Sequence, residues 1–360
     1  MKKRDVLIIV ISAAIIILIA IIILAWCNKP AGKSMEDCKT LAYNGDNKIN
    51  MVLFADEKQA KKYSQFISGI FPFSAKDFNF YCIDSYTSEC ELYKDTALLC
   101  YSKELVKKAS SCPNDYIVVL KEKSSKIRSS SYMNVLSINL RHPLTVLPHE
   151  FGHAFANLAE EYSPATLPQK QENCKDSCDK FSVSDGCFKG CSDNNYFRSI
   201  NSGIMRTLSS NSFGLFNSNL ISEKIDKNEN SKISGNAVQE QINCENQEYY
   251  LIEGVYSNGS IKIKSESVER GCVNGNGAGS FEYALITENG SITSEFNPEL
   301  IFTDSPAEDG TLTGEIYKRD GNFFLKLPII ENVKSLKISN GIEDFAEVAL
   351  FPPSSLPCKK

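Results

Sequence analysis

The sequence predicts an α+β domain followed by a C-terminal antiparallel β-sandwich of the immunoglobulin-like kind, with a single transmembrane helix at the N-terminus. Three observations support this fold class. A long run near the N-terminus lacks charged residues, helical and alternating segments mix through the middle of the chain, and short alternating runs separated by Asn-Gly turns follow residue 246. Mixed strands and helices are typical of an α+β layer, and short strands with such turns are typical of a sandwich.

The N-terminal run is the predicted membrane anchor. Residues 6–26 contain no charged side chain, and they follow a basic segment at positions 2–4. About 20 apolar residues can cross the hydrocarbon core as a helix, and flanking basic residues stay in the cytoplasm. We therefore expect a cytoplasmic tip and anchor over 1–27, a stalk over 28–48, and an extracellular catalytic part. The alternative is a cleaved signal peptide, but signal cores are shorter and no small-x-small cleavage site follows this run.

The size and charge of the chain narrow the function classes. At 360 residues the chain has room for two domains, and its formal net charge of −5 leaves no basic footprint for nucleic acid. Nucleic acid is therefore not an expected partner. The membrane is expected as a partner through the N-terminal helix, and a protein or peptide substrate is expected from the histidine motif described below. The sequence does not indicate an oligomeric state.

The first domain is predicted to cover residues 49–225. It is expected to contain helices over 56–70 and 97–110, strands over 77–83, 116–120 and 134–139, and a further helix that begins near Pro148. The strand at 134–139 alternates and precedes that last helix, so we expect it to line a cleft and to pair with an extended substrate.

A polar, Asn-rich linker over 226–245 separates this domain from the sandwich, which covers 246–360. The linker also contains Asp226-x-Asn228-x-Asn230, which starts like a calcium loop. The central glycine and the bidentate glutamate of such a loop are missing, so calcium is only a weak prediction here.

Cysteine usage agrees with export. The chain has 13 Cys, and setting aside Cys27 at the membrane edge leaves twelve, which predicts up to six disulfides in an oxidising compartment. Four of them form a dense pair of repeats, Cys174-x3-Cys178 and Cys187-x3-Cys191. These four thiols would suit a zinc site, but in an exported chain two disulfides are the favoured interpretation.

The motif His149-Glu150-Phe-Gly-His153 carries the chemistry. Histidines four residues apart project from one face of a helix, where two imidazoles can bind one zinc ion. Glu150 lies beside the first ligand and is placed to take a proton from an attacking water. We therefore expect single-zinc peptide hydrolysis with Glu150 as the catalytic base.

A third ligand is needed to complete such a site, and three residues are candidates. His142 precedes the helix and is followed by proline. Glu160 and Glu161 lie beyond it, and on a straight helix Glu160 would be about 10 Å further along the axis. The chain must therefore leave the helix first, and Asn157 is best suited to the left-handed exit conformation.

The stretch from His149 to Tyr162 resembles the active-site signature of the IgA-specific metallopeptidase family, a metzincin-like group of zinc peptidases. Two positions depart from the family pattern, with Asn157 in place of Gly and Glu160 in place of Asp. The resemblance implies a metzincin-like fold for the first domain and points to Glu160 as third ligand ahead of Glu161. The resemblance implies that Tyr162 is not a ligand but lies next to the ligands, where it contacts them or packs against them.

A second segment, Ser202-Gly-Ile-Met-Arg206, resembles the methionine-bearing turn beneath the metal in metzincins. The resemblance implies that Met205 forms the floor under the zinc and that Arg206 is a structural or substrate-positioning charge. It extends over most of the chain after the anchor, but only residues 149–162 are highly specific.

A competing interpretation is a non-catalytic cell-surface binding protein whose zinc site is purely structural. Such a site would be closed by a fourth protein ligand and would have no need of Glu150. Hydrolysis of a non-peptide amide, such as a cell-wall crosslink, is a third interpretation that the residues leave open.

Overall fold

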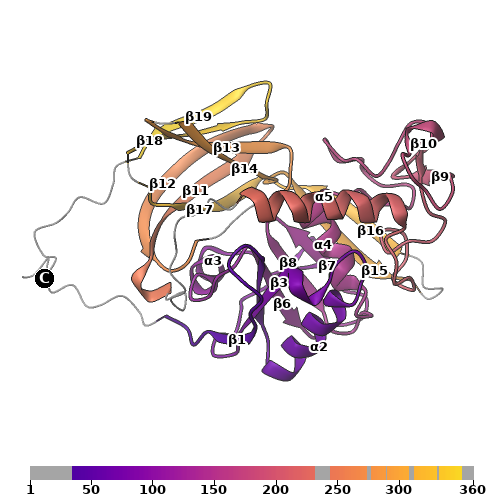
Figure 1. Cartoon of the computed structure of the whole chain (residues 1–360), viewed down its shortest axis with the longest axis horizontal. Helices are drawn as coiled ribbons and strands as arrows, with labels where there is room; N and C mark the ends of the chain where they lie inside the picture. Colours follow the sequence, from indigo (N-terminus) through magenta and orange to yellow (C-terminus); the bar gives the residue numbers. More distant parts are fainter. Residues whose placement is uncertain are drawn as a thin grey trace, which may run out of the picture. The chain divides into compact units, whose positions relative to one another are not determined.

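The computed structural model describes residues 35–231, 244–273, 277–288, 290–307, 312–330 and 332–350 (Figure 1). Residues Glu36–Pro352 cluster as one compact unit. The described chain contains more strand than helix, 39% against 18%. The prediction of an α+β metzincin-like domain is therefore wrong in its fold class, and the fold is β-rich. The prediction failed because several segments without a clear strand signal nevertheless pair, and because two C-terminal strands join the first sheet.

The largest sheet has eight strands in the order β1-β3-β2-β6-β8-β7-β15-β16. The strands are β1 (Lys39–Ala42), β2 (Ile49–Phe54), β3 (Phe78–Ile83), β6 (Tyr116–Lys121), β7 (Ser129–Tyr132), β8 (Val135–Asn139), β15 (Leu300–Pro306) and β16 (Leu312–Lys318). Neighbours among β3, β2, β6 and β8 run parallel, and the remaining pairs are antiparallel. Strand β1 lies within the part of the chain predicted to be a stalk.

The strands predicted over 77–83, 116–120 and 134–139 are confirmed as β3, β6 and β8. Every residue of β8 is buried, and its two edges are taken by β6 and β7. The prediction that β8 pairs with an extended substrate is therefore wrong.

Four α-helices are described: α2 (Glu57–Ser68), α3 (Lys103–Ala109), α4 (Val146–Ala156) and α5 (Leu215–Ser231). The helix predicted over 97–110 is only half correct. Its first part is strand β5 (Ala97–Leu99), which pairs with β4 (Glu91–Tyr93). Helix α3 begins after Ser102, whose side chain accepts the backbone N–H of Leu105 and so caps the helix.

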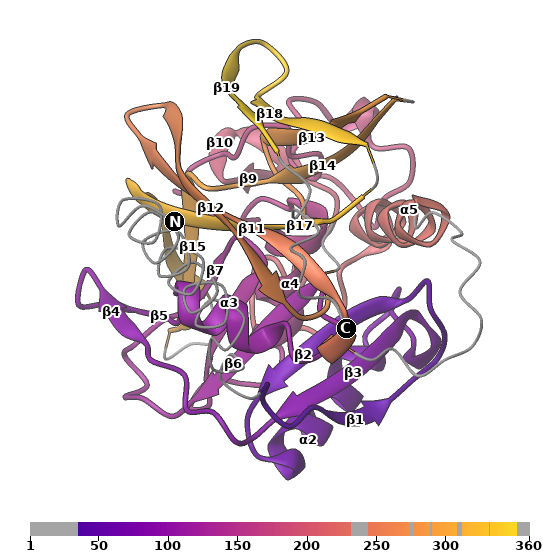
Figure 2. The same ribbon diagram turned by 90° about the vertical axis from the view of Figure 1, so that its left-hand side faces the viewer.

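Two antiparallel sheets form the C-terminal part of the fold (Figure 2). One contains β11 (Glu248–Ser257), β12 (Ser260–Arg270) and β17 (Gly321–Pro328), and the other contains β13 (Phe281–Thr287), β14 (Gly290–Phe296), β18 (Val333–Ser339) and β19 (Asp344–Ala349). Side chains from both sheets share one apolar core, for example Phe323 and Leu336. Between β14 and β17 the chain leaves this part and contributes β15 and β16 to the large sheet.

The described chain contains five disulfides: Cys38–Cys112, Cys90–Cys100, Cys174–Cys191, Cys178–Cys187 and Cys244–Cys272. The dense cysteine segment therefore forms two nested disulfides rather than a four-thiolate zinc site, as predicted. They hold a small hairpin of β9 (Phe188–Cys191) and β10 (Asp193–Arg198). Within the described residues Cys82 is a free thiol, and Cys27 and Cys358 lie outside them.

The predicted single-pass anchor, and the membrane location that followed from it, are not supported. Among the described residues there is no helix with both the length and the apolar character needed to cross a bilayer. Residues 1–27, to which the anchor was assigned, lie outside the described part of the chain.

The calcium interpretation of Asp226, Asn228 and Asn230 is also not supported. Helix α5 continues to Ser231, so these residues are helical. Side chains two positions apart on a helix do not face one another.

Candidate metal centre

Helix α4 positions the two histidines of the motif. It begins at Val146, and His149 and His153 lie one turn apart with their rings 4.8 Å from centroid to centroid. The helix ends at Asn157, whose φ of 51° and ψ of 35° are left-handed, and whose N–H donates to the carbonyls of Gly152 and His153. The predicted helix exit at Asn157 is therefore confirmed. Beyond it the chain turns back toward the helix.

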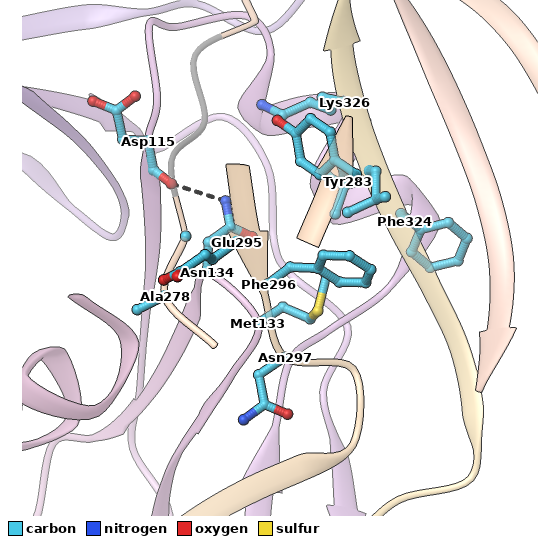
Figure 3. Close-up of a pocket in the computed structure, with 13 residues that line it drawn as sticks. Asp115, Met133, Asn134, Ala278, Tyr283, Glu295, Phe296, Asn297, Phe324 and Lys326 are labelled. Atoms are coloured by element: carbon cyan, nitrogen blue, oxygen red, sulfur yellow. Dashed lines mark hydrogen bonds between the residues drawn. The ribbon is translucent and has the colours of Figure 1, made fainter. Parts of the chain in front are cut away.

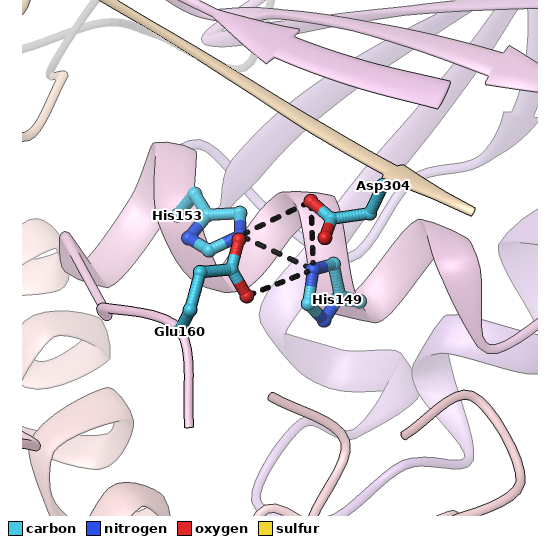
Figure 4. A group of neighbouring side chains, drawn as sticks. All are labelled: His149, His153, Glu160 and Asp304. Atoms are coloured by element: carbon cyan, nitrogen blue, oxygen red, sulfur yellow. Dashed lines mark hydrogen bonds and ion pairs between the residues drawn. The ribbon is translucent and has the colours of Figure 1, made fainter. Parts of the chain in front are cut away.

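The turn brings Glu160 to the two histidines, and a fourth residue, Asp304 of β15, joins them (Figure 4). One ligand atom from each of the four residues lies within 4.8 Å of all the others. The Nε2 atoms of His149 and His153 are 3.2 Å apart. Glu160 Oε1 is 3.1 Å from His153 Nε2, and Asp304 Oδ2 is 3.2 Å from His149 Nε2.

Backbone carbonyls orient both rings. His149 Nδ1 is 3.0 Å from the carbonyl oxygen of Ile204, and His153 Nδ1 is 2.6 Å from that of Leu158. Because a carbonyl can only accept, each Nδ1 carries the proton and each Nε2 turns its lone pair toward the centre. Tyr162 donates its hydroxyl to Asp304 Oδ1 at 2.8 Å, which fixes that carboxylate. Supporting hydrogen bonds of this kind are typical of metal sites.

The burial of the four residues and their missing hydrogen-bond partners indicate whether a cation would be stable between them. His149, Glu160 and Asp304 are 0% exposed, and both oxygens of Glu160 and Oδ2 of Asp304 have no hydrogen-bond partner. Burial raises the pKa of Glu160, and the charge of Asp304 raises it further. Three buried carboxylate oxygens without a hydrogen-bond partner are costly unless a cation neutralises them. Two imidazole nitrogens and two carboxylates can hold a metal ion, so the residues fit one.

Glu150 lies on the same helix, next to His149. It is 0% exposed, and neither of its carboxylate oxygens has a hydrogen-bond partner. Burial raises its pKa well above the usual range, and the nearby charges of Asp304 and Glu160 add to the effect. No hydrogen bond or ion pair of the described residues therefore stabilises this buried carboxylate.

The segment around Met205 packs against α4. A Cβ on Gly152 would lie 2.8 Å from Met205 Sδ, so the helix and this side chain approach too closely for any larger residue. Met205 is fully buried, and its carbonyl accepts the N–H of Glu161 at 2.9 Å. Arg206 Nη1 donates to the carbonyl of Glu161 at 3.3 Å. This segment therefore supports the turn that carries Glu160, and the preceding residue, Ile204, orients His149.

Two other predicted candidates lie outside the cluster. The Glu161 side chain points to α5, where its Oε1 accepts from Asn217 Nδ2 at 2.7 Å. His142 contacts Ser129 Oγ at 3.0 Å and the carbonyl of Ser125 at 3.3 Å. Of the candidate third ligands, only Glu160 reaches the two histidines.

Asp304 is the residue that sequence reasoning missed. It was assigned to the separate sandwich, far along the chain from the motif. One signal was present, because Asp304 closely follows the apolar run Leu300-Ile-Phe302 in a predicted β region. Asp is depleted in strands and seldom fully buried, so its presence there indicates a partner.

A separate cavity of about 50 Å³ lies between the first sheet and the C-terminal sheets (Figure 3). At one wall Asn134 Nδ2 donates to the carbonyl of Asp115 at 2.9 Å, and at another Lys326 contacts Asn114 Oδ1. Burial lowers the pKa of Lys326 to about 7. The only group of potential metal ligands among the described residues is the one around His149, so this cavity is not the candidate centre.

No protein-family model matches the chain, and no curated protein matches it. The geometry of the buried centre therefore carries the functional argument.

Proposed function

We propose that the chain is a zinc-dependent metallopeptidase related in its active-site motif to the IgA-specific metallopeptidases. His149, His153 and Glu160 would hold the zinc ion, and Glu150 would act as general base and then general acid. The observation that carries the proposal is Glu150, which is fully buried beside the cluster with both carboxylate oxygens unpartnered. A carboxylate kept there at a cost in folding free energy is explained by a task in proton transfer.

Each residue of the centre has a separate role in the proposed hydrolysis. A zinc ion held at this centre acts as a Lewis acid toward water and toward a scissile carbonyl. Glu150 takes the proton of the attacking water and returns it to the leaving amine. The carbonyls of Ile204 and Leu158 keep both histidines in the tautomer that presents Nε2 to the centre.

A second candidate function is a non-catalytic binding protein with a structural metal site. Asp304 favours it, because a fourth protein ligand is what closes a structural centre. Glu150 argues against it, because a closed structural site gains nothing from another buried, unpartnered carboxylate.

The test is Glu150→Gln, made in the full-length chain and in a chain that also carries Asp304→Ala. We expect both Glu150→Gln chains to keep the metal content of their parents. In the chain that carries Asp304→Ala, where the fourth candidate ligand is absent, hydrolysis of a mixed fluorogenic peptide substrate should be about 10²–10⁴ times slower with Glu150→Gln than without it. The matched control is Glu89→Gln, an exposed carboxylate, which should leave both values unchanged. Hydrolysis by the Asp304→Ala/Glu150→Gln chain as fast as by the Asp304→Ala chain would show that Glu150 is not the base and that the proposed mechanism is wrong.

A further inference from the structure

The centre is closed in this structure, and the closing residues come from one strand. Glu150 and the candidate ligands are at most 2% exposed, so no substrate can reach them. Asp304 reaches both histidines from β15, and the ring of Phe302, two residues earlier, stacks on His153 at 4.2 Å with 17° between the planes. Figure 4 shows Asp304 and Glu160 approaching the histidines from different segments of the chain. A peptidase with this arrangement is inactive until β15 moves.

Strand β15 also occupies an edge that an extended peptide could use. Strand β7 pairs with β8 on one side and with β15 on the other, and the β15 pairs are Phe302 with Ser131, Thr303 with Ser130 and Asp304 with Ser129. Without β15, the edge of β7 beside the centre would be free to add a strand. The chain therefore places one of its own strands where an extended substrate would lie.

We propose that the β15–β16 strand pair is a built-in inhibitor, in which Asp304 closes the metal centre as a fourth ligand and β15 covers the edge of β7. This inference rests on the proposed peptidase function. It predicts that removing the Asp304 carboxylate opens the centre to small ligands.

The pairing of the strands allows such a movement. Strands β15 and β16 pair with each other through seven residues each, whereas β15 pairs with β7 through three. Strand β16 is the outermost strand of the sheet. The two strands can therefore move together and keep their mutual hydrogen bonds, and among the strand pairings only the short one with β7 is broken. The contacts of Phe302 with His153 and of Asp304 with Tyr162 are lost in the same movement.

The base of the strand pair has contacts of its own outside the metal centre. Tyr132 of β7 donates its hydroxyl to the carbonyl of Pro298, and the Arg319 guanidinium lies 4.8 Å from the Tyr132 ring centroid. Arg319 N–H also donates to the carbonyl of Glu299. These contacts lie just before β15 and just after β16. They form a fixed base about which the rest of the pair can swing.

At the other end, Gly314 of β16 allows Asp304 to sit where it does. A Cβ on Gly314 would overlap with Asp304 Oδ1, with the Tyr162 hydroxyl and with the backbone oxygen of Thr303. Ala at this position would therefore push the Asp304–Tyr162 pair out of place. Gly314→Ala displaces the proposed inhibitor without altering any ligand.

The experiment uses the full-length chain with Asp304→Ala and Gly314→Ala, and with Asp344→Ala as the matched control. Asp344 is an exposed carboxylate on β19 that pairs with Lys337. Each chain is loaded with Co²⁺ in place of zinc, and its visible spectrum is titrated with acetohydroxamate, a small metal-binding ligand. Metal content per chain and hydrolysis of the fluorogenic peptide substrate are measured in parallel.

We expect Asp304→Ala to keep its metal and to bind acetohydroxamate about tenfold more tightly, or better, than the wild type. Gly314→Ala should change in the same direction, and Asp344→Ala should match the wild type. Loss of metal in Asp304→Ala, or unchanged acetohydroxamate binding in both β15–β16 variants, overturns the inference, because Asp304 is then a permanent structural ligand or no ligand.

The hydrolysis readout separates this inference from the proposed function. Tighter acetohydroxamate binding together with increased hydrolysis supports both. Tighter binding without hydrolysis in any chain supports the closing role of Asp304 and overturns the peptidase. A wild type that hydrolyses the substrate as fast as Asp304→Ala supports the peptidase and overturns the inhibitor.

Discussion

Glu160 and Glu161 are neighbours in the chain with opposite surroundings. Glu160 faces two imidazoles and a second carboxylate, and neither of its oxygens has a hydrogen-bond partner. Glu161 is also fully buried, but its Oε1 accepts from Asn217, and its pKa is raised by burial only to about 7 because such hydrogen bonds oppose the shift. One carboxylate is arranged for a cation and the other for the protein interior.

Substituting each glutamate separates these two environments. We expect Glu160→Ala to weaken zinc binding by about tenfold or more, about 1.4 kcal/mol, because a ligand is lost. Glu161→Ala should keep the metal but lower the free energy of unfolding by about 1–3 kcal/mol, because Asn217 is left without its partner. Metal affinity by chelator competition and stability by urea titration check both values. The reverse pattern would move the third ligand to Glu161.

At this scale the sequence predicted the local part of the centre. His149, Glu150 and His153 are set by helical spacing, and the return of Glu160 follows from the left-handed conformation that Asn157 tolerates. Asp304 could not be placed, because its partner residues are brought together only by strand pairing between distant segments. The choice between Glu160 and Glu161 likewise needed the position of α5, a helix that the sequence did not predict.

Helix α4 is the element that the centre depends on. All its residues from Val146 to Ala156 are buried, although its two histidines make it look amphipathic in sequence. It packs so closely on the segment below that Gly152 has no room for a side chain next to Met205. The glycine between the two histidines is therefore a packing requirement of the helix.

Gly152→Ala tests this packing. We expect the substitution to lower the free energy of unfolding by about 1–3 kcal/mol, because the new methyl group overpacks against Met205 Sδ. The double variant Gly152→Ala/Met205→Ala should lose less stability than the sum of the two single losses, since the side chain that clashes is gone. Denaturant titrations of the metal-free proteins measure the packing alone. Additive losses in the double variant would mean that Met205 is not the residue in contact.

For the elements in general, long buried strands were predicted well and short strands were not. The apolar run Tyr116–Lys121 is a central strand because such runs are typical of strands buried on both faces. Ala97–Leu99 was taken as helix because its apolar residues continue into the helix after Ser102. Only the cap at Ser102 and the disulfide at Cys100 mark the boundary.

The whole molecule is held together by strands that cross between its two halves. Ile301 of β15 is fully buried in the core that also contains Val119 of β6, and Leu251 of β11 lies in the same cluster. Lys103 of α3 pairs with Glu253 of β11 at 2.9 Å. The first sheet therefore relies on residues after 246 for part of its core.

A chain that ends at residue 245 should show this dependence. We expect it to lose cooperative thermal unfolding, because it lacks β15, β16 and the apolar side chains of β11 that cover the first sheet. A chain that ends at Leu350 retains every described residue and serves as the control with a wild-type melting temperature. Cooperative unfolding of the 1–245 chain within a few degrees of the full-length protein would show that the two halves are independent domains.

The position of Asp304 late in the chain also determines the order in which the residues of the centre are synthesised. Asp304 lies 142 residues after Tyr162, the residue to which it is hydrogen-bonded. At about 5–20 residues per second, a ribosome needs roughly 7–28 s to travel that distance. His149, His153 and Glu160 thus leave the ribosome well before the strand that closes over them. The newborn chain therefore passes through a stage in which three of the four candidate ligands exist and Asp304 has not been made. If Asp304 closes the centre as proposed, closure comes late in biosynthesis.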